Sequence, residues 1–248
     1  VVDNASKDKS VAWLKQQKDM KLLCNEENCG FPIGCNQGIR MAEKESDILL
    51  LNNDTIMTPN ALFWLHMGLY ENDQVGSTGS VSNYVANGQA VIENGKIEGE
   101  YFAFARKNNV PMENSYVNKA SLDGFALLLK RCVLEKTGYL DERFSPGNFE
   151  DNDICLRIML SGYRNVLCKN SFIIHWGSLP KCYDEREKII KKTASLPWIL
   201  GDINILLDLQ RKGILNPECY ENIKMYWEQL SDISLEVLKN IAYGKYSK

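Results

Sequence analysis

The sequence predicts an α/β fold followed by a helical C-terminal part. Two short apolar runs without polar alternation, 48–51 and 124–129, are typical of strands buried on both faces, as in a parallel sheet. Helical patterns with recognisable start or stop signals follow each run. From residue 183 onward the pattern is helical throughout. We therefore expect an α/β domain over residues 1–180 and a helical extension over 181–248.

Composition limits the possible functions. The chain has 248 residues with a formal net charge of −3, which gives no electrostatic footprint for nucleic acid or an anionic membrane. No apolar run approaches the roughly 20 residues that span a bilayer. The eight cysteines form no Cys-x-x-Cys pair and suit no common zinc site, so we interpret them, for example Cys132, Cys155 and Cys168, as buried free thiols. A reducing, cytoplasmic location follows, with at most peripheral contact at the inner face of the membrane.

The first residues read as the end of a strand that runs into a polar loop. Because a strand needs about five residues and a parallel sheet needs a crossover, we expect a first strand and helix to be missing before Val1. Ser10 can cap a helix over 11–17, and 21–24 is a strand candidate. Glycines at 30, 34 and 38 share one face of a helix predicted over 32–42. They indicate close approach of a ligand or of another backbone, and tight helix–sheet packing explains them equally.

Asp54 ends the first apolar run, in the sequence Asn52-Asn53-Asp54. Ligands of open α/β sheets bind just beyond such strand ends, although a turn or a helix cap also explains the residue. Thr58-Pro59 predicts the start of the next helix, on which His66 reads as structural or surface-exposed. The stretch 83–119 reads as irregular, either a lid or acceptor loop or a plain surface excursion. The other predicted elements are a weak strand at 75–81, a helix that stops at Gly138, a helix at 151–160, strands at 165–169 and 172–174, and tail helices at 184–195, 198–212, 217–230 and 233–242.

Three acidic or imidazole positions form a chemical set: Asp54, the Glu150-Asp151-x-Asp153 cluster and His175. Acidic residues in a first helical turn complement the helix dipole, and a histidine at a strand end is often structural. Together, however, an Asp and a His could hold Mg²⁺ or Mn²⁺ with a diphosphate, while another carboxylate takes a proton from a hydroxyl. A P-loop, a Gly-x-Ser-x-Gly elbow and a His-Glu-x-x-His motif are absent from the sequence.

These motifs, in this order, resemble the inverting, GT-A-type glycosyltransferases of family two, in particular the rhamnosyltransferase-like branch. The resemblance covers about residues 1–178. The motifs that carry it are Val1-Val2-Asp3-Asn4-Ala5-Ser6, Asn28-x-Gly30-Phe31-x-x-Gly34-x-Asn36-x-Gly38-Ile39, Leu49-Leu50-Leu51-Asn52-Asn53-Asp54-Thr55, 124–129 with 138–144, 149–157, and His175-x-Gly177-Ser178. It implies a GT-A fold, a Rossmann-like mixed sheet flanked by helices.

The resemblance also implies roles for individual residues. Asp3 matches the residue that holds the nucleotide base, and Asp151 matches the general base, supported by Glu150. Asp54 matches the metal-binding carboxylate of the D-x-D segment, and His175 completes the metal or diphosphate site. Asp153 with Arg157 is structural. The remaining nucleotide-sugar-binding positions are Asn28, Gly30, Gly34, Asn36, Asn52, Asn53 and Gly124.

The implied reaction moves a sugar from a UDP- or dTDP-sugar to a glycan, lipid-linked or protein acceptor, with a divalent cation. Asn52 departs from the family pattern, because it replaces the first carboxylate of D-x-D. One alternative is an inactive module that binds nucleotide sugars or glycans. Another is a sugar nucleotidyltransferase, which would need a Gly-rich, basic N-terminal loop that this sequence does not show.

Overall fold

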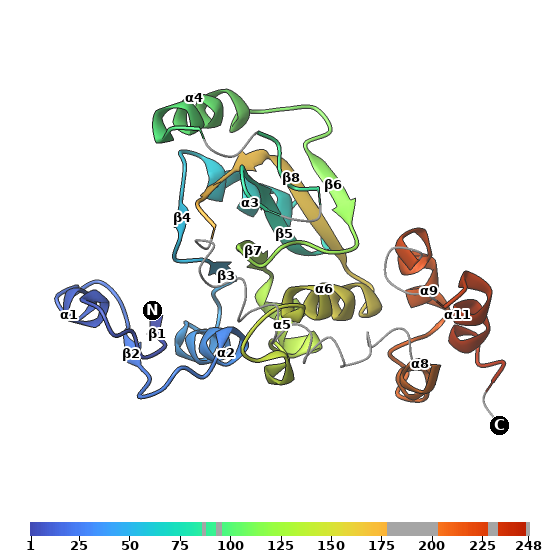
Figure 1. Cartoon of the computed structure of the whole chain (residues 1–248). Coiled ribbons are helices and arrows are strands. Elements are labelled where there is room, and N and C mark those ends of the chain that lie inside the picture. Colours follow the sequence, from blue (N-terminus) through green and yellow to red (C-terminus); the bar gives the residue numbers. More distant parts are fainter. Residues whose placement is uncertain (86–87, 93–95, 178–202, 228–232, 247–248) are drawn as a thin grey trace.

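The computed structural model describes residues 1–85, 88–92, 96–177, 203–227 and 233–246 (Figure 1). Its strands are β1 (Val2–Asp3), β2 (Leu23–Cys24), β3 (Ile48–Leu51), β4 (Thr55–Ile56), β5 (Val75–Val81), β6 (Tyr116–Lys119), β7 (Ala126–Leu129), β8 (Arg164–Phe172) and β9 (Ile174–His175). Its α-helices are α1 (Ser10–Leu14), α2 (Phe31–Met41), α3 (Ala61–Leu69), α4 (Glu98–Asn108), α5 (Arg131–Thr137), α6 (Glu150–Leu160), α8 (Ile203–Arg211), α9 (Pro217–Ile223) and α11 (Leu235–Ala242). Two 3₁₀ turns, Glu142–Phe144 and Lys224–Tyr226, complete the described elements.

The central sheet is mixed and five-stranded, in the order β3-β7-β5-β8-β6. Within it, β5 and β8 run parallel, whereas β7 is antiparallel to both β3 and β5, and β6 is antiparallel to β8. Two smaller ladders lie beside it: β1 pairs with β2 in parallel, and β4 pairs with β9 antiparallel. The predicted α/β class is therefore confirmed.

The two apolar runs of the sequence play different parts in this sheet. β7 is buried along its whole length, because Leu127 and Leu129 enter one apolar cluster while Ala126 and Leu128 enter the cluster on the opposite face. The prediction for 48–51 is wrong in part. β3 pairs antiparallel at the sheet edge, and Leu51 is 41% exposed.

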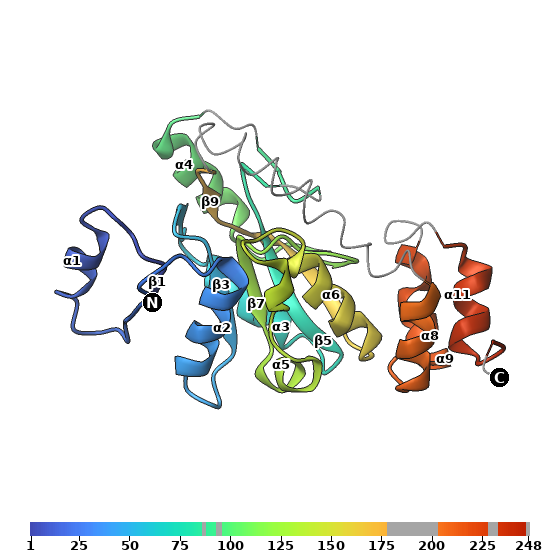
Figure 2. The ribbon, with the colours of Figure 1, turned by 60° about the horizontal axis from the view of Figure 1, so that its bottom comes forward.

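Helices cover both faces of the sheet. On one face α2, α5 and α6 contribute residues such as Ile39, Val133 and Ile154 to the larger cluster. On the other face α3 places Ala61, Leu65 and Leu69 against the strands. Figure 2 shows α2 beside β3, and α5 and α6 beside β7 and β5.

Several local predictions are corrected by the structure. Ser10 is the first residue of α1 and makes no capping bond. Thr58 does not cap α3; Asn60, in the left-handed region at φ 65°, takes that place, and the Thr58 hydroxyl donates to the carbonyl of Phe172. The stretch 83–119 is not irregular throughout, because it contains α4 and β6.

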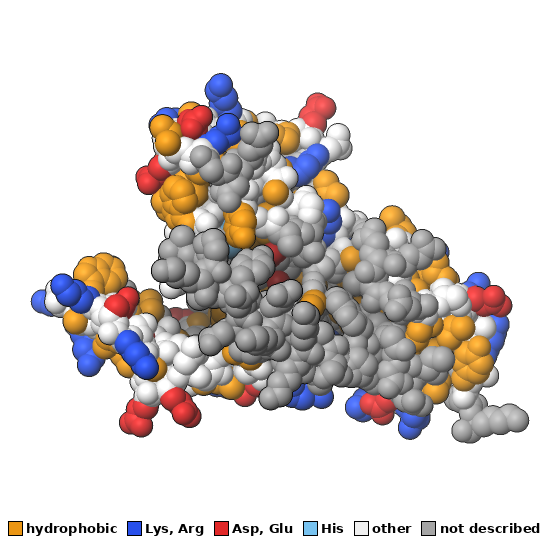
Figure 3. All heavy atoms as spheres, viewed as in Figure 1, with side chains coloured by type: hydrophobic (Ala, Val, Ile, Leu, Met, Phe, Trp, Pro, Cys, Tyr) orange, Lys and Arg blue, Asp and Glu red, His pale blue; other side chains and the backbone are white. Residues whose placement is uncertain are grey.

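The C-terminal helices pack against α6 around buried Trp227, with Leu156 and Leu160 of α6 in the same apolar cluster. Asn216 caps α9 as predicted, because its side chain accepts from the Cys219 amide. Figure 3 shows hydrophobic side chains on the outer face of these helices. The predicted helix at 184–195 lies outside the described residues. No described helix is long and apolar enough to cross a membrane.

The cysteine prediction holds in part. Cys155 and Cys168 are buried free thiols, and burial raises the pKa of Cys155 to about 12. Cys132 is free but exposed on α5.

Candidate active site

Asp54 and His175 meet beyond the end of β3. The segment after β3 turns back as β4, which pairs with β9 so that Thr55 lies opposite His175. Oδ1 of Asp54 lies 3.2 Å from Nε2 of His175, and Nδ2 of Asn52 lies 3.4 Å from the same nitrogen. The structure therefore brings together the two predicted metal ligands.

The surroundings of His175 fix which ring nitrogen carries the proton. Nδ1 lies 2.6 Å from the carbonyl oxygen of Tyr84, and a carbonyl can only accept, so Nδ1 is the protonated nitrogen. The ring also stacks on Phe125 at 5.0 Å and an angle of 18°. Nε2 is therefore the nitrogen that faces Asp54, and it is the ring atom that would bind a metal.

This donor set suits a divalent cation only with additional ligands. Asp54 supplies an anionic oxygen and His175 a nitrogen, a combination found at Mn²⁺ and related sites. The described residues contain no group of three or more His, Cys, Asp or Glu side chains that could hold a metal alone. Water or a bound diphosphate would supply the further oxygens.

Asp151 lies at the start of α6 with both carboxylate oxygens held. Oδ2 accepts from the Gly124 amide at 2.9 Å, and Oδ1 accepts from the Asn152 amide at 2.8 Å. A Cβ on Gly124 would lie 3.3 Å from the Asp151 Cβ, so a glycine allows this close approach. Burial raises the pKa of Asp151 above its usual range despite the two amide bonds.

Glu150 is the more deeply buried neighbour, at 6% exposure. Its Oε2 has no hydrogen-bond partner among the described residues. Burial, with the charge of Asp151 as the second cause, raises the pKa of Glu150 to about 7. Asp123 adds a smaller unfavourable charge to both carboxyls. Three carboxyl groups therefore share this part of the site.

A single turn connects the two halves of the site. The Phe125 carbonyl accepts from the Asn52 amide at 2.9 Å, and the Phe125 ring stacks on His175. The preceding residue, Gly124, donates to Asp151. The Asp123–Phe125 turn at the start of β7 thus ties the Asp54–His175 pair to the Asp151 carboxylate.

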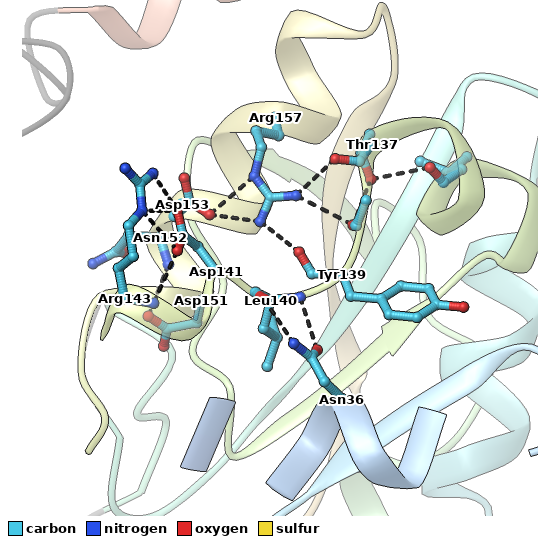
Figure 4. A network of polar contacts seen from close by, with 12 residues as sticks. Asn36, Thr137, Tyr139, Leu140, Asp141, Arg143, Asp151, Asn152, Asp153 and Arg157 are labelled. Atoms are coloured by element: carbon cyan, nitrogen blue, oxygen red, sulfur yellow. Dashed lines mark hydrogen bonds and ion pairs between the residues drawn. The ribbon is translucent and has the colours of Figure 1, made fainter. Parts of the chain in front are cut away.

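A polar network orients α6 (Figure 4). Arg157 pairs with Asp153, with Nε 2.9 Å from Oδ2, and donates to the carbonyls of Thr137 and Tyr139 at the end of α5. These bonds fix the helix that carries Glu150 and Asp151. The prediction that Asp153 and Arg157 act structurally agrees with these contacts.

The N-terminal candidates lie on β1, on α2 and on the loop that precedes α2. Asp3, in β1, is 6% exposed, and its Oδ2 accepts from the Ser6 amide at 3.0 Å. Asn28 is exposed and accepts from the Gly30 amide. Asn36 is buried, and its amide makes two bonds with the backbone of Leu140, as Figure 4 shows. Asn36 therefore offers its amide to the protein rather than to a ligand.

Two glycines allow close contacts at the start of α2. A Cβ on Gly30 would lie 2.8 Å from the Pro146 Cα, and the Phe31 amide donates to the Pro146 carbonyl. A Cβ on Gly34 would lie 2.9 Å from Nδ2 of Asn4. Gly30 therefore allows the close approach of another backbone segment, whereas Gly34 makes room for a side chain.

Some site residues were not predicted from the sequence. Asp123 and Phe125 flank Gly124 at the beginning of an apolar run, and β7 runs antiparallel to β3. The start of β7 therefore lies beside the end of β3. A polar residue just before the apolar run of β7 thus indicates a site at this edge, as Asp54 does just after the apolar run of β3. Asn83 and Tyr84 gave no such signal, because they act through side chain-to-backbone contacts with His175.

The family described as Glycosyl transferase family 2 matches residues 1–118, just under half of the chain. No curated protein matches the chain. Three solved structures share its fold at low sequence identity. The fold is GT-A.

The first structure is the mannosyltransferase PcManGT from Pyrobaculum calidifontis in complex with GDP-Man and Mn²⁺. It has a TM-score of 0.54 and 17% identity, over 97% of this chain and 59% of its own. GalNAc-T7 with UDP, GalNAc and Mn²⁺ has a TM-score of 0.55 and 14% identity, over 91% and 52%. S. aureus TarS 1-349 has a TM-score of 0.50 and 12% identity, over 99% and 80%. The chain thus spans little more than half of the first two structures, and at these identities the likeness shows the fold alone.

Proposed function

We propose that this chain transfers a sugar from a nucleotide-diphosphate sugar to a hydroxyl acceptor, with inversion at the anomeric carbon. The observation that carries the proposal is the Asp123–Phe125 turn, which links a metal-type Asp54–His175 pair to the held carboxylate of Asp151. The proposed donors are UDP- or dTDP-sugars, and the proposed acceptors are glycans, lipid-linked or protein groups. The proposed setting is cytoplasmic synthesis of a polysaccharide or glycoconjugate.

Asp54 and His175 would hold the divalent cation, Mg²⁺ or Mn²⁺. Its chemistry is to neutralise the charge that develops on the leaving diphosphate. The Mn²⁺ complexes of PcManGT and GalNAc-T7 support a cation at this site. Phe125 and the Tyr84 carbonyl keep the imidazole in the orientation and tautomer that it needs.

Asp151 would act as the general base. It takes the proton of the acceptor hydroxyl while that oxygen forms its bond to the anomeric carbon and the bond to the diphosphate oxygen breaks. One such displacement inverts the centre and needs no enzyme nucleophile, as in inverting glycosidases. A raised pKa makes the Asp151 carboxylate a stronger base, and the Gly124 amide fixes its direction. Glu150, buried beside it, supports the base.

The nucleotide-binding roles of Asp3, Asn28, Gly30, Gly34, Asn36, Asn52, Asn53 and Gly124 stay predictions. For Gly124 the role is extended here, because its amide holds Asp151. For Asn36 the role would be indirect, through the position of α2.

The test is the Asp151→Asn variant, assayed with a panel of nucleotide sugars and Mn²⁺. We expect transfer to fall by about 10²- to 10⁴-fold, because the amide cannot take the proton. Binding of the nucleotide sugar, followed by calorimetry, should persist. Asp208→Asn on α8, where the side chain is 47% exposed, is the matched control and should retain full transfer.

Full transfer by Asp151→Asn would refute the assignment of the base. Binding of a nucleotide sugar by the unmodified protein, without turnover for any donor in the panel, would instead favour a non-catalytic binding module.

A further inference from the structure

The strand that carries His175 is held on its two edges by different kinds of group. On one edge, β9 pairs with β4, and the Trp176 amide donates to the Asp54 carbonyl at 2.9 Å. On the other edge, His175 bonds to a side chain. Nδ2 of Asn83 donates to the His175 carbonyl, and Oδ1 of Asn83 accepts from the His175 amide, both at 2.9 Å.

The Asn83 amide continues the edge of β5 after that strand has ended. The Val81 carbonyl accepts from the Ile173 amide at 3.0 Å, and the Ser82 hydroxyl donates to the Ile173 carbonyl at 2.8 Å. Two residues further along the chain, at His175, Asn83 offers one donor and one acceptor, as a peptide group does. Asn83 is 3% exposed, so water does not compete for these two bonds.

We propose that Asn83 is a positioning residue for His175, which sets the imidazole against Asp54 for cation binding. The inference rests on the proposed function for its purpose, but its geometry is independent of that function. The β4–β9 ladder has two residues in each strand, and a ladder this short needs support from outside itself. Asn83 provides that support at the residue whose ring faces Asp54.

Replacing the Asn83 amide with a carboxylate tests this role directly. In Asn83→Asp the carboxylate has the same shape but cannot donate to the His175 carbonyl, and it faces that carbonyl oxygen with negative charge. The backbone of His175 must then move away from this edge. The side chains of Asp54 and His175 are themselves unchanged in the variant.

Asn109 offers a matched control, because its side chain bonds to the backbone of Phe172, in the same segment as His175. It is 2% exposed, its Oδ1 accepts from the Phe172 amide at 2.8 Å, and its Nδ2 lies 3.3 Å from the Phe172 carbonyl. Asn109→Asp thus makes the same chemical change, but its effect falls on Phe172, three residues before His175. Both variants lose buried hydrogen bonds, so a general loss of stability should affect both.

The experiment titrates each protein with Mn²⁺ alone and follows the free ion by its electron paramagnetic resonance signal. We expect Asn83→Asp to weaken Mn²⁺ binding by about 10- to 100-fold, the usual effect of removing a group that orients a ligand. Asn109→Asp should bind Mn²⁺ as the unmodified protein does. Thermal unfolding of both variants checks that they remain folded at the temperature of the titration. Asn83→Ser is read in the same way should Asn83→Asp not fold.

Unchanged Mn²⁺ affinity in the Asn83 variant, an equal loss in both variants, or no binding by the unmodified protein would overturn the inference. Transfer activity is measured separately on the unmodified protein. Absence of transfer with the expected pattern of Mn²⁺ binding would refute the proposed function and leave the role of Asn83 standing.

Discussion

Oδ1 of Asp54 and Nε2 of His175 lie 3.2 Å apart, although the two residues are far apart in the sequence. Because Nδ1 donates to the Tyr84 carbonyl, Nε2 is the nitrogen that faces the carboxylate. A carboxylate oxygen and an imidazole nitrogen at this distance are held together by a positive charge between them, either a proton on Nε2 or a bound cation. A metal ion that binds here takes the place of that proton.

The first prediction concerns this pair. His175→Gln removes the ring nitrogen that faces Asp54, so Mn²⁺ affinity should fall at least about tenfold. Transfer at limiting Mn²⁺ should fall with it. Titration of free Mn²⁺ by paramagnetic resonance measures the first effect, and initial rates over a range of Mn²⁺ concentrations measure the second.

The control for this prediction is His66→Gln, at the second of the two histidines in the chain. His66 is exposed on α3, with its ring 4.9 Å from that of Tyr70. Its replacement should leave Mn²⁺ affinity unchanged. Equal affinities for the His175 variant and the control would remove His175 from the metal site.

The second prediction concerns the contact between Gly124 and Asp151. In Gly124→Ala the new Cβ would lie 3.3 Å from the Asp151 Cβ, so the carboxylate has to shift by a few tenths of an ångström. We expect kcat to fall by about tenfold or more with little change in KM, since misplacement of a base acts mainly on the chemical step.

Gly99→Ala is the matched control, because a Cβ there meets nothing within 4 Å and the residue lies within α4. That change should leave kcat unaltered and stabilise the fold by up to about 1 kcal/mol. A KM effect without a kcat effect at Gly124 would indicate that the glycine admits substrate rather than orients Asp151.

Much of the fold follows from local patterns in the sequence. The apolar run at 124–129 forms β7 over 126–129, and the helix predicted at 151–160 forms over 150–160, because burial and capping act over a few residues. The edge position of β3 does not follow from its composition. Four apolar residues suit a central or an edge strand equally, and strand order depends on partners far along the chain.

The start of α3 shows a different limit. Thr58 and Pro59 are good start signals, yet the Thr58 hydroxyl bonds instead to the Phe172 carbonyl, and the helix begins later. A tertiary hydrogen bond thus overrides a local preference, and nothing near Thr58 in the sequence reveals its distant partner.

The sequence predicted those site residues that stand directly at the end of a strand or at the start of a helix. Asp54, Asp151 and His175 each follow an apolar strand or open a helix, and such ends gather at one edge of an α/β sheet. Asn83 could not be found in this way, because its contribution is two bonds to the backbone of a residue far along the chain. A side chain that hydrogen-bonds to a distant backbone segment leaves no periodic pattern in the sequence.

The third prediction concerns the start of α2. Gly30 has φ 90°, and a Cβ there would lie 2.8 Å from the Pro146 Cα, a backbone atom that cannot turn aside. Gly30→Ala should therefore destabilise the fold by about 1–3 kcal/mol. Chemical denaturation measures this change. Gly38→Ala, whose Cβ would lie at an ordinary 3.6 Å from Val2, is the comparison and should have a much smaller effect. Equal effects would show that the Pro146 contact is not what requires a glycine.

The last prediction follows from the buried carboxyl of Glu150. Its pKa is raised from 4.5 to about 7, by burial first and then by the charge of Asp151, with Asp123 contributing less. Between pH 4.5 and 7 the folded protein therefore holds a proton that the unfolded chain has released. This group stabilises the fold most at low pH, and its contribution is lost as pH rises through about 7.

Glu150→Gln removes this titration and keeps the shape of the side chain. Relative to the unmodified protein, the variant should gain up to about 3 kcal/mol of unfolding free energy between pH 4.5 and 8. Denaturation at several pH values gives the difference, with Glu135→Gln on the exposed face of α5 as a control. Asp123, Asp151 and Cys35 face the carboxyl in both proteins, so their own titrations largely cancel in the difference. A difference that does not vary with pH would mean that Glu150 is ionised throughout, and its negative charge would then bear directly on the basicity of Asp151.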